Sequence, residues 1–139
     1  MNTIQVEIVS AEGEIFSGPA KMVFLPAIEG EMGVAPRHAP LLTMLKAGEV
    51  RVQPPEGPEQ SFWVGGGALE VQPKKVTVLA DTAARAKDLD EAAALAAKQR
   101  AEDALRGATD KITQAEAMAE ITRMIAQLRL IEKLRKLKA

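Results

Sequence analysis

The chain contains no cysteine, a single histidine and few aromatic residues, and each shortage argues against a class of function. Without cysteine there is neither a disulfide framework nor a thiolate metal site, a composition compatible with a reducing cytoplasm. Aromatic residues make up 3% of the sequence, so platforms on which single-stranded bases could stack are nearly absent. The formal net charge of -1 gives no general reason to expect nucleic acid as a partner.

Long hydrophobic runs are also missing. No apolar stretch approaches the roughly 18 residues that a membrane-spanning helix needs, so any membrane association is expected to come through a partner. The first residues, MNTIQVEIVSAEGE, carry acids where a signal or transit peptide would carry bases, and we expect no targeting segment. The 139 residues fit one compact domain or a small domain with an appendage.

Short strands are predicted over the first half of the chain. Apolar and polar residues alternate, and turn residues separate the runs every ~8 to 12 residues, which is typical of an antiparallel sandwich or barrel. Three prolines between Pro54 and Pro58 predict a hairpin tip. Strands are expected around residues 4–8, 22–25, 62–64, 69–71 and 76–78.

The segment from Glu29 to Val52, EGEMGVAPRHAPLLTMLKAGEVRV, has unusually particular glycine and proline positions. Glycine permits positive φ near the start of the segment, while Pro36 and Pro40 fix φ on either side of His38. The pattern predicts a turn, a strand, a tight corner and another strand. A lone histidine without cysteine or a second histidine predicts a surface or corner residue, with contact to a partner as the functional alternative.

Two further groups have a structural and a functional interpretation. Gly65, Gly66 and Gly67 precede a strand-like stretch and not a helix, so we expect a hairpin there and no phosphate-binding loop. Glu29 and Glu31 could suggest acid-base chemistry, but nothing indicates a cleft with a catalytic partner. A solvated loop, or an exposed loop that touches another polar surface, is expected instead.

The last third of the chain is predicted to form a helical hairpin. Proline is absent after Pro73 and alanine dominates, with Asp88 or Asp90 available to cap a first helix that Gly107 ends. Thr109 or Asp110 can cap a second helix, which runs from about Lys111 toward the carboxyl end. The expected fold is thus an amino-terminal antiparallel β-sandwich, residues 1–84, followed by a two-helix hairpin, residues 85–139.

The second helix carries more apolar surface than one neighbouring helix can cover. Its apolar residues follow two faces, so another surface must receive one of them: the sandwich, a different protein, or each in turn. Residues 121–139 hold six basic residues and one acid, which favours an acidic receiving site. The basic residues of interest are Arg123, Arg129, Lys133, Arg135 and Lys136.

Five sequence blocks in the same order resemble one known family, the epsilon subunit of bacterial F-type ATP synthases. The most specific is the EGE-x-G-x-x-x-x-HAPLLT segment that begins at Glu29. The others are VSAE with FSG (9–18), GG-x-LEV-x-P (66–73), VTVLADTA (76–83) and IAQLR (125–129), so the resemblance covers nearly the whole chain.

The resemblance implies a flattened ten-stranded sandwich, a two-helix hairpin and a non-catalytic role. Such a subunit belongs to the central stalk: its sandwich grips the gamma subunit and rests on the c-subunit ring, on the cytoplasmic face of the bacterial inner membrane. Residues that match the family's gamma-facing surface are Ser10, His38 and Thr43. Residues that match the loop at the c ring are Glu29, Gly30, Glu31 and Gly33.

The resemblance also gives the helical hairpin a regulatory role. In the family the hairpin folds against the sandwich or extends along gamma to the catalytic beta and alpha subunits, where it blocks ATP hydrolysis. Members that bind ATP start the first helix with (I/L)-D-x-x-R-A, whereas here Leu89 and Asp90 are followed by Ala93 and Ala94. The missing guanidinium removes the natural phosphate partner, so we expect no tight nucleotide binding, with Arg100 and Arg123 as the residues that could compensate. We also expect no cofactor and no metal.

Two other classes of function make different demands on the residues. A small ligand-binding sandwich with a helical dimerisation tail predicts a stable homodimer, whereas a rotor subunit predicts an isolated monomer that binds gamma. A hydrolytic enzyme requires a set of nucleophile, base and orienting residue that the sequence does not offer.

Overall fold

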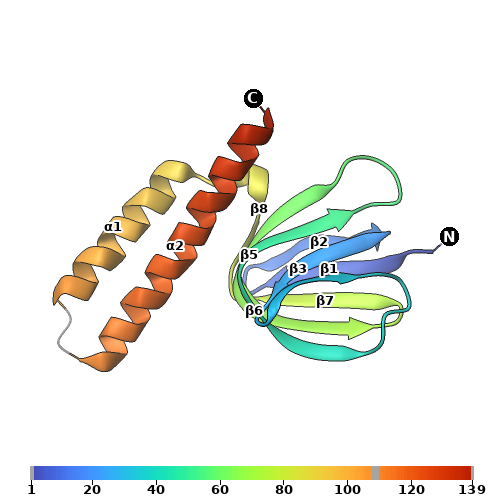
Figure 1. Cartoon of the computed structure of the whole chain (residues 1–139), viewed down its shortest axis with the longest axis horizontal. Helices are drawn as coiled ribbons and strands as arrows, with labels where there is room; N and C mark the ends of the chain where they lie inside the picture. Colours follow the sequence, from blue (N-terminus) through green and yellow to red (C-terminus); the bar gives the residue numbers. More distant parts are fainter. Residues whose placement is uncertain (1, 108–109, 139) are drawn as a thin grey trace. The chain divides into compact units, whose positions relative to one another are not determined.

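The computed structural model describes residues 2–107 and 110–138. It contains two compact units, of which one ends at Lys87 and the next begins at Asp88 (Figure 1). The first unit is built of strands and the second of two helices, which confirms the predicted fold class.

Eight strands of the described residues form one sheet. They are β1 (Ile4–Ser10), β2 (Gly13–Ala20), β3 (Met22–Ala27), β4 (Gly30–Val34), β5 (Leu41–Gln53), β6 (Gln60–Gln72), β7 (Lys75–Ala80) and β8 (Ala83–Arg85). The order is β2-β1-β7-β6-β5-β3-β4, with β8 paired to β6. Only the β1–β7 pair among them is parallel. The resemblance implied ten strands, whereas the described residues form eight, of which β5 and β6 are the longest at 13 residues each.

Alternation places one face of each strand in a common core. Ile4, Val6 and Ile8 of β1 are fully buried, while the residues between them are only half-buried. The strands at both ends of the sheet order contribute to a single apolar cluster, β2 through Ala20 and β4 through Val34. The sheet therefore folds over on itself as a sandwich whose interior holds the apolar residues, as the pattern predicts.

The three consecutive glycines do not form the predicted hairpin. They lie inside β6, where the strand changes its partner from β7 to β8. Gly66 and Gly67 have φ values of 100° and 141°, and a Cβ on Gly67 would lie 2.1 Å from the carbonyl oxygen of Leu79. Glycine is needed here because one strand bends sharply against another backbone. Glycine is favoured both in a hairpin turn and in a bend within a strand, and the sequence does not distinguish the two. The hairpin prediction was wrong for this reason.

The segment around the histidine follows its predicted course. The turn before Gly30 leads into β4, the corner spans residues 35–40, and β5 follows as a single strand. The proline-rich stretch between Gln53 and Gln60 connects β5 to β6, so the predicted hairpin tip is confirmed.

Two helices form the second unit, α1 (Glu91–Gly107) and α2 (Lys111–Lys138), preceded by the short 3-10 helix η1 (Ala86–Asp88). The Asp90 carboxylate accepts a hydrogen bond from the Ala93 amide at 3.2 Å, so Asp90, not Asp88, is the cap of α1. Asp110 caps α2 in the same way through the Thr113 amide at 2.7 Å. The alternative cap, Thr109, lies outside the described residues. The helices pack against each other as a hairpin.

Candidate partner-binding surfaces

His38 lies in the corner between β4 and β5 and is half-buried. Its Nδ1 is 2.7 Å from the carbonyl oxygen of Ala39, which can only accept, so Nδ1 carries the proton. The His38 amide donates to the carbonyl of Ala35 at 3.2 Å, and the amide of Arg37 donates to Pro73 at 2.9 Å. The corner is thus fixed by backbone hydrogen bonds, and Nε2 is left to act as an acceptor.

The other two residues expected to face gamma lie at different places in the sandwich. Ser10 ends β1, where its hydroxyl accepts a hydrogen bond from the Glu12 amide at 3.3 Å. Thr43 is opposite the fully buried Leu69 in the β5–β6 pair, so its half-buried side chain is on the core side of β5. The structure therefore does not bring Ser10, His38 and Thr43 into one cluster.

The outer face of the same strands carries an apolar row that the sequence reasoning missed. Met44 of β5, Ala68 of β6, Leu79 of β7 and Val9 of β1 are successive cross-strand neighbours. Met44 and Leu79 are 53% and 54% exposed, and Leu42, on the same face as Met44, is 74% exposed. We call Leu42, Met44, Ala68, Leu79 and Val9 the outer apolar row. Leu42 and Met44 belong to a run that looks uniformly apolar in the sequence, and their grouping with Leu79 depends on strand pairing, so no local sequence signal marked the row.

The four residues expected at the c ring are only partly in a loop. Glu29 is in the turn before β4, exposed and without an ion pair among the described residues, whereas Glu31 and Gly33 belong to β4 itself. Gly30, the first residue of β4, has a φ of 136°, which favours glycine. The Glu29–Glu31 segment lines a hollow of about 470 Å³ together with Leu42 and Thr43. The structure thus places Thr43 beside the c-ring set and not beside Ser10.

Glu31 is exposed, and its carboxylate pairs with Arg51 of β5 at 2.6 Å. Arg51 also approaches Glu59 at 3.5 Å and Glu49 at 4.0 Å, and its guanidinium lies 4.4 Å from the centre of the Phe24 ring. The hydrogen bond to Glu31 raises the pKa of Arg51, and partial desolvation opposes this effect. Three carboxylates around one guanidinium leave this face of β5 negative.

The start of α1 is occupied by structural contacts. The Asp90 carboxylate caps the helix, Ala94 is buried, and Leu89 is half-buried. Ala93 is exposed and offers only a methyl group where the nucleotide-binding motif has arginine. These residues explain the helix start without a ligand.

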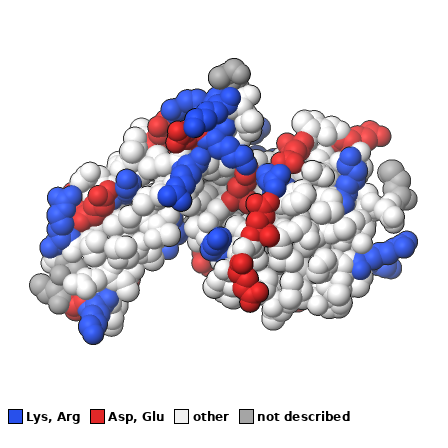
Figure 2. Space-filling view, viewed as in Figure 1, with Lys and Arg blue, Asp and Glu red and all other residues white. Residues whose placement is uncertain are grey.

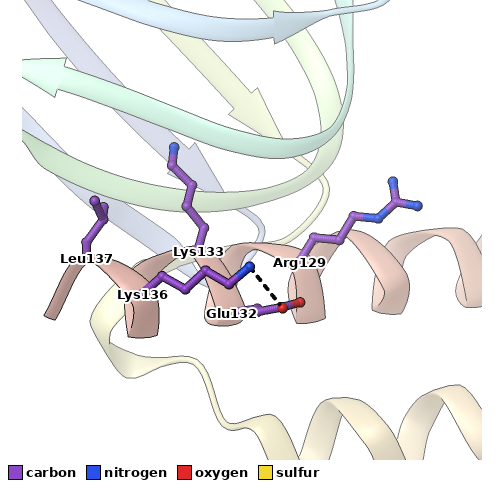
Figure 3. A pocket seen from close by; sticks show the side chains of 5 residues that line it. All are labelled: Arg129, Glu132, Lys133, Lys136 and Leu137. Atoms are coloured by element: carbon purple, nitrogen blue, oxygen red, sulfur yellow. Dashed lines mark ion pairs between the residues drawn. The ribbon is translucent and has the colours of Figure 1, made fainter. Parts of the chain in front are cut away.

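Three of the basic residues of α2 lie together. Arg129, Lys133 and Lys136 line a hollow of about 320 Å³ with Leu137 and Glu132, and Lys136 pairs with Glu132 at 3.4 Å (Figure 3). Lys and Arg side chains gather beside the carboxyl end of α2 (Figure 2). The remaining two point elsewhere: Arg123 pairs with Glu120 on α2, and Arg135 pairs with Glu91 at the start of α1.

The apolar residues of α2 are spread around the helix. Ile112 and Leu137 are 74% and 73% exposed and Met118 is also exposed, whereas Ala117 and Leu130 are buried. A helix with apolar residues on its exposed side has surface to offer to another protein. The described residues include no helix long and apolar enough to cross a membrane, and they show no group of three or more potential metal ligands.

Comparison with known proteins gives two family matches that together span almost the whole chain. Residues 3–86 match the family model described as ATP synthase, Delta/Epsilon chain, beta-sandwich domain, and residues 87–132 match ATP synthase, Delta/Epsilon chain, long alpha-helix domain. The ATP synthase epsilon chain of Nitrosococcus oceani is 62% identical over 134 residues, 96% of each chain. That of Halorhodospira halophila is 57% identical over 138 residues, 98% of this chain and 97% of the relative.

Solved structures share the fold at low identity. A chain of the Euglena gracilis mitochondrial ATP synthase, in a structure of OSCP/F1/c-ring, aligns with a TM-score of 0.77 and 18% identity over 91% of this chain and 79% of that one. A chain of the Tetrahymena thermophila mitochondrial ATP synthase central stalk and c-ring aligns with a TM-score of 0.64 and 14% identity, covering 94% and 95%. From the two family matches and the bacterial relatives, the chain belongs to the epsilon chains of the bacterial F-type ATP synthase.

Proposed function

We propose that the chain is a non-catalytic central-stalk subunit of the proton-translocating ATP synthase, which joins the c ring and gamma to the catalytic head. The observation that carries the proposal is the outer apolar row, because a sandwich with a fully formed core still exposes Leu42, Met44 and Leu79 on one face. Exposed contiguous apolar surface marks a site that another protein covers. The subunit is then held at the cytoplasmic face of the inner membrane by its partners alone.

Gamma is the partner that covers the outer apolar row and the neighbouring His38 corner in this proposal. The row supplies area to bury, and the Nε2 of His38, for which the described residues offer no hydrogen-bond partner, supplies one acceptor at its border. The c ring meets the end of the sandwich that carries Glu29. Glu29 suits this role better than Glu31 because its carboxylate has no ion pair among the described residues.

The helical hairpin is the regulatory part of the proposed subunit. Inhibition of ATP hydrolysis needs a helix that presents charge and apolar surface to the catalytic beta and alpha subunits. Support comes from the basic hollow of Arg129, Lys133 and Lys136 and from the exposed Ile112, Met118 and Leu137. Regulation by bound ATP is not part of the proposal, because Ala93 replaces the arginine that would meet phosphate.

The experiment is reconstitution of the chain with the catalytic core of the complex. Deleting residues 111–139 should leave binding to gamma unchanged and raise the rate of ATP hydrolysis. Replacing Arg129, Lys133 and Lys136 together by Gln should raise the rate without removing the helix. A matched control replaces three basic residues of α1, Lys98, Arg100 and Arg106, by Gln and should leave the rate unchanged. An unaltered rate after the deletion would remove the inhibitory role while leaving the stalk role standing.

A further inference from the structure

The corner before β5 contains a turn whose geometry calls for glycine and whose residue is arginine. The His38 amide donates to the Ala35 carbonyl at 3.2 Å, which closes a four-residue turn with Pro36 and Arg37 at its centre. Arg37 has a φ of 68°, the one positive value among the non-glycine residues described. Proline at the second position and positive φ at the third are the features of a type II turn, in which the third residue is normally Gly or Asn.

Arginine at this position destabilises the fold. A side chain with a Cβ is strained in the left-handed region, and the neighbouring structure must hold it there. Here the hold comes from the Arg37 amide, which donates to the Pro73 carbonyl at 2.9 Å in the β6–β7 turn. The Arg37 side chain does not offset this strain, because it is exposed and has no ion pair among the described residues.

A second free cation lies in the turn to which Arg37 is tied. Lys74 follows Pro73, is exposed and likewise has no ion pair in the described part of the chain, while its carbonyl accepts the Gln5 amide at 3.0 Å. Lys75, the next residue, is already neutralised by Glu7 at 3.0 Å. The two linked turns therefore present two uncompensated positive charges on rigid backbone beside His38.

We propose that Arg37 and Lys74 form a cationic contact that receives a carboxylate of the partner subunit covering the His38 corner. The inference rests on the proposed function, in which that partner is gamma. A guanidinium on a rigid turn is pre-organised to pair with a carboxylate. The strain at Arg37 is then explained: the residue serves the complex at the expense of the isolated fold.

The test measures thermal unfolding of the free chain and its affinity for purified gamma. Arg37→Gly and Arg37→Asn should raise Tm by about 2–5 °C, because each relieves the turn. Both should weaken binding to gamma about threefold to tenfold at low salt, and the difference should shrink at about 0.5 M salt. Lys74→Gln should weaken binding without raising Tm. Lys21→Gln, which removes an exposed charge from the turn between β2 and β3, is the matched control and should change neither quantity.

Each outcome below either supports or overturns the inference. Higher Tm with weaker binding supports the inference. Unchanged binding by the Arg37 variants, or a Tm that does not rise in either of them, overturns it while the stalk role stands, provided that the wild-type chain binds gamma. If the wild-type chain does not bind gamma, both this inference and the proposed function fail.

Discussion

The carboxylate of Glu31 lies 2.6 Å from the guanidinium of Arg51, although the two residues are 20 positions apart in the chain. The pair joins β4 to β5, two strands that are not neighbours in the sheet order because β3 lies between them. Phe24 of β3 supplies the ring over which the guanidinium sits. The contact therefore ties three strands on the outer face of the sandwich.

Arg51→Gln should lower the free energy of unfolding by about 1 kcal/mol, because it leaves Glu31, Glu49 and Glu59 close together without their cation and removes the contact with Phe24. Urea unfolding measures the change. The control is Lys75→Gln, which breaks the single, partly exposed ion pair with Glu7 and should cost no more than about 0.5 kcal/mol. Equal losses would mean that the charge cluster adds nothing beyond an ordinary surface pair.

Gly67→Ala should destabilise the chain by about 3 kcal/mol or more, because the new Cβ would overlap the Leu79 carbonyl oxygen in addition to straining φ. Gly57→Ala is matched to it: φ is 93°, but no atom lies within 4 Å of the added Cβ. That variant should lose only about 1 kcal/mol. Denaturant unfolding of both separates the overlap from the strain, and similar losses would contradict the bend in β6.

These two regions, compared with features that were predicted correctly, show which parts of the fold the sequence can predict. The alternation in β1 and the proline-rich tip predicted strands and turns correctly, because those signals are local. The bend at Gly65–Gly67 and the pairing of Glu31 with Arg51 depend on which strands become neighbours. Strand register is set by long-range pairing, so neither could be read from a short window.

The outer apolar row could not be predicted from the sequence for the same reason. Leu42 and Leu79 share a face only through the β5–β6 and β6–β7 registers, which the sequence does not display. The helix caps, in contrast, depend on residues three positions apart. The sequence therefore narrowed the capping residue of α1 to Asp88 or Asp90, and the structure shows that it is Asp90. For the partner surfaces, the family resemblance supplied candidate residues but not their grouping.

The cap of α2 should make its stability depend on acid pH. Hydrogen bonds from Thr113 hold the pKa of Asp110 below its ordinary value of 3.8, so the folded state favours the ionised cap. Its contribution is therefore present above pH 3.8 and is lost as the pH falls through the lower folded-state pKa. Helical circular dichroism of the wild-type chain should decrease in that window more than that of Asp110→Asn, which caps without titrating.

Asp110→Ala completes this comparison. It removes the cap at every pH, so its helical signal should be lower than that of the wild-type chain at neutral pH and should approach it in strong acid. A wild-type signal that follows that of Asp110→Asn throughout would show that the ionised carboxylate has no special role.

Leu79 and Val78 are adjacent residues on opposite faces of β7 and should respond oppositely to the same change. Leu79→Asn alters an exposed side chain of the outer apolar row, so we expect a nearly unchanged Tm and about tenfold weaker binding to gamma. Val78→Asn buries an amide in the core and should destabilise by about 3 kcal/mol or more. Differential scanning calorimetry and a binding titration distinguish the two, and undiminished binding by Leu79→Asn would exclude this face as the interface.

The most direct measurement is sedimentation of the full chain alone and after titration with purified gamma subunit. The account predicts a monomer when the chain is alone, and a complex of one chain with one gamma whose Kd is below about 1 μM. A stable homodimer that does not bind gamma would contradict the account, because the outer apolar row would then be covered by a second copy of the chain and not by gamma.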